Sequence, residues 1–257
     1  MRQKTSAIIL AIILFTQIIA VSALSTGDAK NEWLNLKQIS KEKRELYRDA
    51  KTDFAAYNSE VNKQDIINTG KETLHAALNE AEAWLIWKEL VAKENSQIPA
   101  NLKSAIESDV ETNLGKINGL RSEVDSITDR LDLGIVFLKM IGKYSELITD
   151  VARNNGLVLV YRANLRIESL ESFEGKLRAV AKDTDSNEEL DLALLSIQEA
   201  KSNIEKSKNA YNKVIIGGTP LIKHAEANSY LGVARVNMLE AHSHLTVAYK
   251  QIRGAKQ

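Results

Sequence analysis

Apolar residues that recur alternately four and three positions apart constrain the fold of this chain most strongly. A clear run of this kind lies between residues 106 and 131, with one polar position. It consists of Ile106, Val110, Asn113, Ile117, Leu120, Val124, Ile127 and Leu131. A period of about 3.5 residues predicts near-parallel helices that pack through an apolar seam. A buried Asn113 would fix the register of that packing, whereas an Asn113 facing solvent would leave Leu114 to cover the gap. The sequence leaves both alternatives open.

The same spacing recurs along most of the chain and predicts six helices. Only two prolines occur in 257 residues, and both Pro99 and Pro220 stand at expected helix starts. The helices are expected at residues 28–58, 64–93, 100–131, 133–182, 187–215 and 220–253. Asn154-Asn155-Gly156 could break the fourth helix, but the apolar spacing continues through it and favours one long helix. Short connections favour antiparallel neighbours. We therefore expect an all-α fold, an elongated antiparallel, coiled-coil-like bundle that forms a single domain over residues 24–257.

The N-terminus has the pattern of a secretory signal peptide. Arg2 and Lys4 precede an apolar run, and small residues follow it at Val21-Ser22-Ala23. We expect residues 1–23 to be a signal peptide that is cleaved after Ala23, which makes the mature protein secreted, extracellular or attached to the cell surface. One alternative is an uncleaved anchor, although the run is short for a full membrane span. A pilin-type signal, cut before the apolar run, is the other alternative.

The residue types exclude several kinds of catalytic chemistry. The absence of cysteine excludes disulfides, thiol nucleophiles and Cys-ligated clusters. Glu72 and His75 form one Glu-x-x-His pair, an element that di-iron helical bundles use twice. No second histidine has a glutamate three residues before it, so these two residues are weak metal candidates. Phosphate-binding loops and nucleophile elbows are also missing from the sequence. We expect a protein that is not an enzyme, with no catalytic residues, no metal and no cofactor.

Two groups of residues are candidates for contact with a partner. Trp84 and Trp87 lie three residues apart on one predicted helix and could form an aromatic platform, or pack in the core. Lys250, Arg253 and Lys256 lie in a C-terminal stretch, residues 206–257, that has an excess of basic over acidic residues. They could form a patch for an anionic envelope surface. Alternatively, the basic stretch pairs with the acidic residues of the preceding helix.

Three segments carry a resemblance to known proteins. They are Ala83-Trp84-Leu85-Ile86-Trp87, Gly156-Leu157-Val158-Leu159-Val160-Tyr161-Arg162-Ala163 and Glu240-Ala241-His242-Ser243-His244-Leu245. Together with the signal peptide, they resemble a loosely defined group of uncharacterised, secreted, all-helical bundle proteins of archaea and bacteria. The resemblance covers most of residues 60–250. It implies an exported bundle and transfers no catalytic residues.

The sequence therefore predicts a secreted or cell-surface helical structural or interaction protein without catalytic activity. Its expected partner is a protein or a component of the cell envelope, and not a nucleic acid, because the 34 basic and 34 acidic residues balance. Contact with a membrane is expected only through an uncleaved N-terminus, and an oligomer is compatible with the pattern. One alternative is a membrane-active bundle that turns the apolar patches 133–141 and 157–161 outward. The other is a helical bundle that binds a metal or a ligand.

Overall fold

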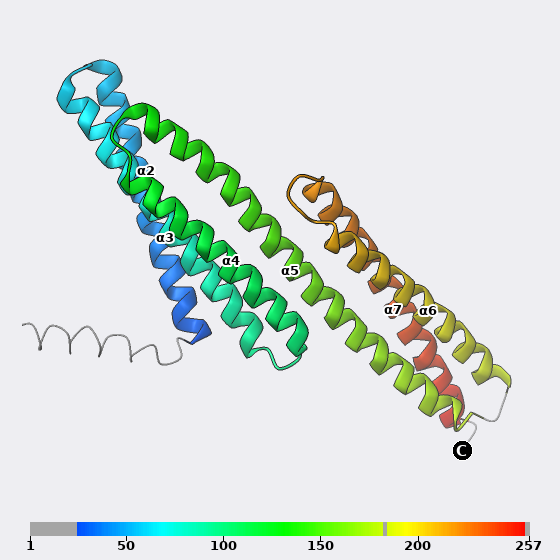
Figure 1. The fold of residues 1–257 in the computed structure, drawn as a ribbon. Coiled ribbons are helices and arrows are strands. Elements are labelled where there is room, and N and C mark those ends of the chain that lie inside the picture. Colours follow the sequence, from blue (N-terminus) through cyan, green and yellow to red (C-terminus); the bar gives the residue numbers. More distant parts are fainter. Residues whose placement is uncertain (1–24, 182–183, 255–257) are drawn as a thin grey trace, which may run out of the picture. The chain divides into compact units, whose positions relative to one another are not determined.

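The structure is a computed structural model that describes residues 25–181 and 184–254. Its described residues form six helices and no strands (Figure 1). The helices are α2 (Thr26–Ala56), α3 (Glu60–Glu94), α4 (Ala100–Asp125), α5 (Arg130–Arg178), α6 (Thr184–Asn212) and α7 (Pro220–Gly254). The predicted all-α bundle class is confirmed. The predicted signal peptide, residues 1–23, and the basic residue Lys256 lie outside the described residues.

The predicted helix ends are close to the observed ones, with one informative error. The third helix was predicted to continue to residue 131, but α4 ends at Asp125. The reason is a helix cap, because an Asp129 carboxylate oxygen accepts the backbone N–H groups of Leu131 and Asp132 at 2.8 and 2.9 Å. Helix α5 therefore begins at Arg130, and Leu131 lies in its first turn with 71% of its surface exposed.

The rest of the predicted apolar seam is buried as expected. All of the predicted seam residues except Leu131 are buried, and these are Ile106, Val110, Asn113, Ile117, Leu120, Val124 and Ile127. Asn113 is only 2% exposed, so the structure selects the buried alternative for this position. A polar side chain at such a position favours one register of helix packing over its neighbours.

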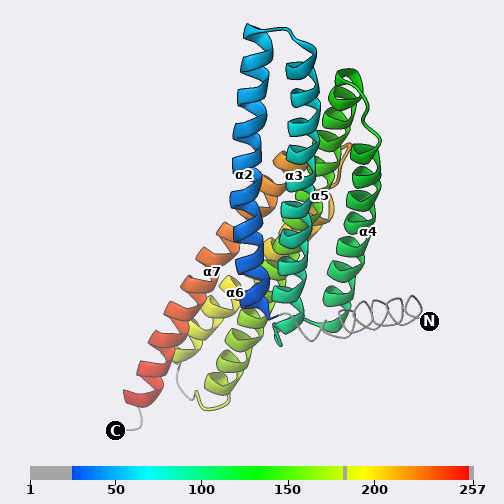
Figure 2. The ribbon, with the colours of Figure 1, turned by 90° about the vertical axis from the view of Figure 1, so that its left-hand side faces the viewer.

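The contacts divide the chain into two compact units. Unit 1 comprises residues 25–96 together with Val110–Phe137, and unit 2 comprises Gln97–Asp109 together with the described residues from Leu138 onward. Both α4 and α5 contribute to the two units. In unit 1, α2 and α3 lie side by side (Figure 2). The Lys71 ammonium of α3 donates to the backbone oxygens of Asp125 and Ile127, at 3.0 and 3.3 Å, and so fixes the turn between α4 and α5.

Unit 2 is built around three helices, α5, α6 and α7, which share one apolar core. Buried residues recur every seven positions in α6 and α7. In α7 they include Ala227, Ala234, Ala241 and Ala248, and in α6 they include Leu190, Ile197, Ile204 and Tyr211. Alanines at these positions let the backbones of α6 and α7 approach closely, and the Ser207 hydroxyl of α6 donates to the Ala227 carbonyl of α7 at 2.9 Å.

Helix α5 is continuous through Asn154-Asn155-Gly156, as the sequence predicted. The triplet serves packing, because an Asn154 side-chain N–H donates to Asp109 at 3.0 Å and the aromatic ring of Tyr211 lies against Gly156. A Cβ atom on residue 156 would lie 2.2 Å from that ring, a spacing that only glycine permits without movement. Among the described helices, none is both long and apolar enough to span a lipid bilayer.

Candidate functional site

The two weak metal candidates, Glu72 and His75, have separate partners in unit 1. The Glu72 carboxylate accepts from the Lys43 ammonium at 2.8 Å, and His75 Nε2 lies 2.9 Å from an Asp125 carboxylate oxygen. Within residues 25–181 and 184–254, no three metal-ligating side chains come together. Glu72 and His75 therefore act in the structure as links between neighbouring helices.

The tryptophan candidates are only partly exposed. Trp87 stacks on Trp33 of α2, with 4.9 Å between the ring centroids. The Lys88 ammonium lies 4.2 Å from the Trp87 ring centroid, and the Lys37 ammonium lies 5.0 Å from that of Trp33. Trp84 is half-buried beside Leu85, which is fully buried. The two stacked rings thus cover one another and join α2 to α3.

The C-terminal basic candidates that the structure describes are Lys250 and Arg253. Both are exposed in the last turns of α7. Cations at the end of a helix interact favourably with its dipole. Neither residue lines the groove between α5 and α7 that is described next.

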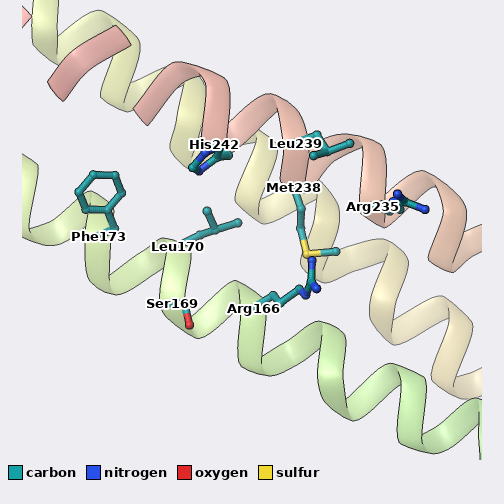
Figure 3. A pocket seen from close by; sticks show the side chains of 8 residues that line it. All are labelled: Arg166, Ser169, Leu170, Phe173, Arg235, Met238, Leu239 and His242. Carbon is teal, nitrogen blue, oxygen red and sulfur yellow. The ribbon is translucent and has the colours of Figure 1, made fainter. Parts of the chain in front are cut away.

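A groove between α5 and α7 in unit 2 was not predicted from the sequence (Figure 3). Its volume is about 480 Å³, within the range of small-molecule sites. Helix α5 contributes Arg166, Ser169, Leu170 and Phe173, and α7 contributes Arg235, Met238, Leu239 and His242. None of these eight residues is acidic. The groove therefore combines apolar walls with positive charge.

The charged groups of the groove lie at one end. In Figure 3, Arg166 and Arg235 stand at one end, Leu170, Met238 and Leu239 lie between, and Phe173 and His242 stand at the other end. Within the part of the chain that the structure describes, neither of these arginines forms an ion pair. Two other arginines of unit 2, Arg153 and Arg178, are paired, with Asp109 at 2.6 Å and with Glu174 at 2.5 Å. Two unpaired guanidinium groups thus face the same groove.

The local sequence explains why these side chains share a groove. On α5, Arg166, Leu170 and Phe173 follow one another at steps of four and three, and so lie on one face of the helix. On α7, Arg235, Leu239 and His242 have the same spacing. The neighbouring faces point into the core, where Ile167 of α5 and Ala234 and Ala241 of α7 are buried. Each of these two sets of residues begins with an arginine and has the same spacing, a pattern that is visible in the sequence. Only the structure shows that the two sets lie opposite one another.

The groove holds a hydroxyl and an imidazole, yet these do not form a nucleophile–base pair. The Ser169 hydroxyl donates to the backbone carbonyl of Leu165, at 2.9 Å, in its own helix. Nucleophilic catalysis by serine needs that proton to be directed at a base. The geometry therefore favours binding at this groove over covalent chemistry.

Comparisons with protein-family models, with curated proteins and with solved structures find no match for the chain.

Proposed function

We propose that this protein is an exported, non-catalytic helical binding protein that takes a small component of the cell envelope into the α5–α7 groove. The groove itself is the observation that carries this proposal. It offers half-buried apolar side chains for desolvation, together with two arginines that have no acidic partner among the described residues. Pockets that combine an apolar lining with a few polar groups are typical of ligand binding.

The N-terminal sequence supports the exported location. Arg2 and Lys4, the apolar run and the small residues before Leu24 have the order of a secretory signal. Mass spectrometry of the protein recovered from the medium and the envelope fraction tests this part. We expect a polypeptide that begins at Leu24. A protein found only in the cytoplasm and still beginning at Met1 would contradict it.

The binding part is tested by blocking the groove. Ser169 is exposed at its edge, so Ser169→Trp should fill the groove and leave the core intact. Purified wild-type and variant proteins are mixed with an organic extract of the native envelope, separated from free small molecules, and analysed by mass spectrometry. We expect the wild-type protein to retain a compound that the variant does not. Retention of nothing, or of the same compounds by both proteins, would overturn the proposal.

A membrane-active bundle is a second candidate, and exposed residues of α5 favour it. Leu138, Ile141 and Ile148 are 71%, 54% and 55% exposed. Large apolar side chains on a helix surface can insert into the acyl region of a bilayer. Leakage of dye from phosphatidylglycerol vesicles would support this function. Intact anionic and neutral vesicles at saturating protein would exclude it.

A further inference from the structure

We propose that the ligand of the α5–α7 groove is a single-chain anionic amphiphile of the fatty-acid type. Its carboxylate would lie between Arg166 and Arg235, and its alkyl chain would run along Leu170, Met238 and Leu239. This inference rests on the proposed function, because it assigns the chemistry of the ligand to the groove already described. It goes further in that it fixes the charge of the ligand, the number of its chains and its direction.

The arginine end of the groove selects an anion. Arg166 and Arg235 belong to different helices and have no acidic partner among the described residues. Two like charges that face one groove repel each other, and a bound anion would relieve that repulsion. A guanidinium group presents a planar fork of donors that matches a carboxylate. The free energy of binding should therefore depend on a negative charge and on both arginines.

The middle of the groove selects an alkyl chain. Leu170, Phe173 and Met238 are half-buried, and Leu239 is 60% exposed. A ligand that covers them removes apolar surface from water, which is the main favourable contribution to such binding. Only a few apolar side chains line the groove, and its volume is about 480 Å³. That space suits one chain, so a lipid with two acyl chains would leave one of them in water.

The direction of the ligand follows from the order of the lining residues, which run in the same direction along the groove on α5 and on α7. Arg166 precedes Leu170 and Phe173, just as Arg235 precedes Leu239 and His242 (Figure 3). A carboxylate held by the arginines thus directs its chain toward Phe173 and His242. A short anion such as butyrate would reach the charges but cover little of the apolar wall.

Calorimetric titration of the purified protein with three probes tests the assignment. Dodecanoate has both charge and chain, butyrate keeps the charge, and dodecyltrimethylammonium keeps the chain with the opposite charge. We expect one dodecanoate per protein, an affinity at least about tenfold lower for the cationic probe, and no measurable binding of butyrate. Equal affinity for the two long-chain probes would overturn the assignment, as would the absence of dodecanoate binding.

Charge variants with a matched control locate the carboxylate. Arg166→Gln and Arg235→Gln should each weaken dodecanoate binding about tenfold, the loss of one charge-assisted hydrogen bond. Arg253→Gln removes the same charge from an exposed position on α7 outside the groove and should leave the affinity unchanged. An equal loss in all three variants would show an effect of net charge alone and would overturn the placement.

Apolar variants locate the chain in the same way. Leu239→Ser should weaken dodecanoate binding, whereas Val236→Ser should not, because Val236 is 53% exposed and lies outside the groove. Equal effects would overturn the proposed path of the alkyl chain.

Different results would overturn the proposed ligand class and the proposed function. If Ser169→Trp abolishes retention of an envelope compound but dodecanoate does not bind, the groove is a binding site for another class of ligand. If Ser169→Trp has no effect on retention, the proposed function itself fails.

Discussion

Replacing Gly156 by alanine tests how tightly α5 packs on α6 in unit 2. An ideal Cβ on residue 156 would lie 2.2, 2.3 and 2.5 Å from three ring atoms of Tyr211. Non-bonded carbon atoms prefer a separation of about 3.5–4.0 Å, so the ring or the helix would have to move by about 1 Å. The ring is fully buried, and the Tyr211 hydroxyl donates to an Asn228 side-chain oxygen at 2.7 Å. The ring is therefore held at both ends and has little freedom to move.

The expected magnitude follows from two opposing contributions. Overpacking a core costs about 1–3 kcal/mol, and replacing glycine by alanine inside a helix gains about 1 kcal/mol. Gly142→Ala is a matched control, because Gly142 lies in the same helix, is exposed, and has no neighbouring atom within 4 Å of an added Cβ. Gly142→Ala should stabilise the protein by about 0.5–1 kcal/mol. The difference between the two variants isolates the steric cost of about 1–3 kcal/mol.

Urea unfolding with two probes measures this difference. Circular dichroism follows all the helices, whereas the fluorescence of Trp33, Trp84 and Trp87 follows unit 1, which contains all three tryptophans. We expect Gly156→Ala to lower the circular dichroism midpoint relative to Gly142→Ala. In a Tyr211→Ala background, the same glycine substitution should become stabilising, because the obstructing ring is gone. Equal stabilisation by the two glycine variants in the wild-type background would refute the packing argument.

Three further predictions concern other contacts. Burial raises the pKa of Tyr211. The stability that this difference in pKa contributes is therefore fully present below the pKa of about 10 in the unfolded chain. It is lost as the pH rises through the pKa of Tyr211 in the folded protein. Unfolding measured at alkaline pH should therefore depend less on pH in Tyr211→Phe, and an unchanged dependence would contradict this. Lys71→Met should lower the free energy of unfolding by about 1–2 kcal/mol by tryptophan fluorescence, since two carbonyls lose a charged donor. Lys63→Met, which removes an exposed ion pair, should cost under about 0.5 kcal/mol, and equal costs would refute the role of Lys71. Trp33→Ala should cost at least about 0.5–1.5 kcal/mol, the contribution of a stacked aromatic pair, and abolish the near-ultraviolet dichroism of that pair; an unchanged spectrum would show that the rings do not stack.

The helices could be predicted because their signals are local. Pro220 begins α7, and Gly217 adopts a φ of +84° in the turn before it, a conformation that glycine favours. The apolar seam was also visible, because burial follows from spacing. The error at Leu131 has the same origin, since the spacing continues across a point where Asp129 caps a new helix. Periodicity alone does not reveal a helix that ends and restarts in register.

The groove could not be predicted, because it depends on which faces of distant helices meet. Arg166 and Arg235 each look like an ordinary exposed cation on an amphipathic helix. Sequence spacing places each beside its own apolar neighbours, but it does not say that α5 and α7 face each other. Conversely, Glu72, His75 and Trp87 stood out in the sequence, and the structure gives each of them a packing or pairing partner. Rare residue types such as histidine and tryptophan are conspicuous in a sequence, whereas the arginines and leucines of the groove are common on amphipathic helices.

Photochemical labelling tests the central claim, that the α5–α7 groove binds a single-chain anion, most directly. The purified protein is equilibrated with a dodecanoate analogue that carries a diazirine at the end of its chain, irradiated and digested, and the labelled residues are identified by mass spectrometry. We predict labelling near Phe173 on α5 and near His242 on α7, competed by dodecanoate and lost in Ser169→Trp. Labelling concentrated on α2 and α3, or labelling that dodecanoate does not displace, would contradict the claim.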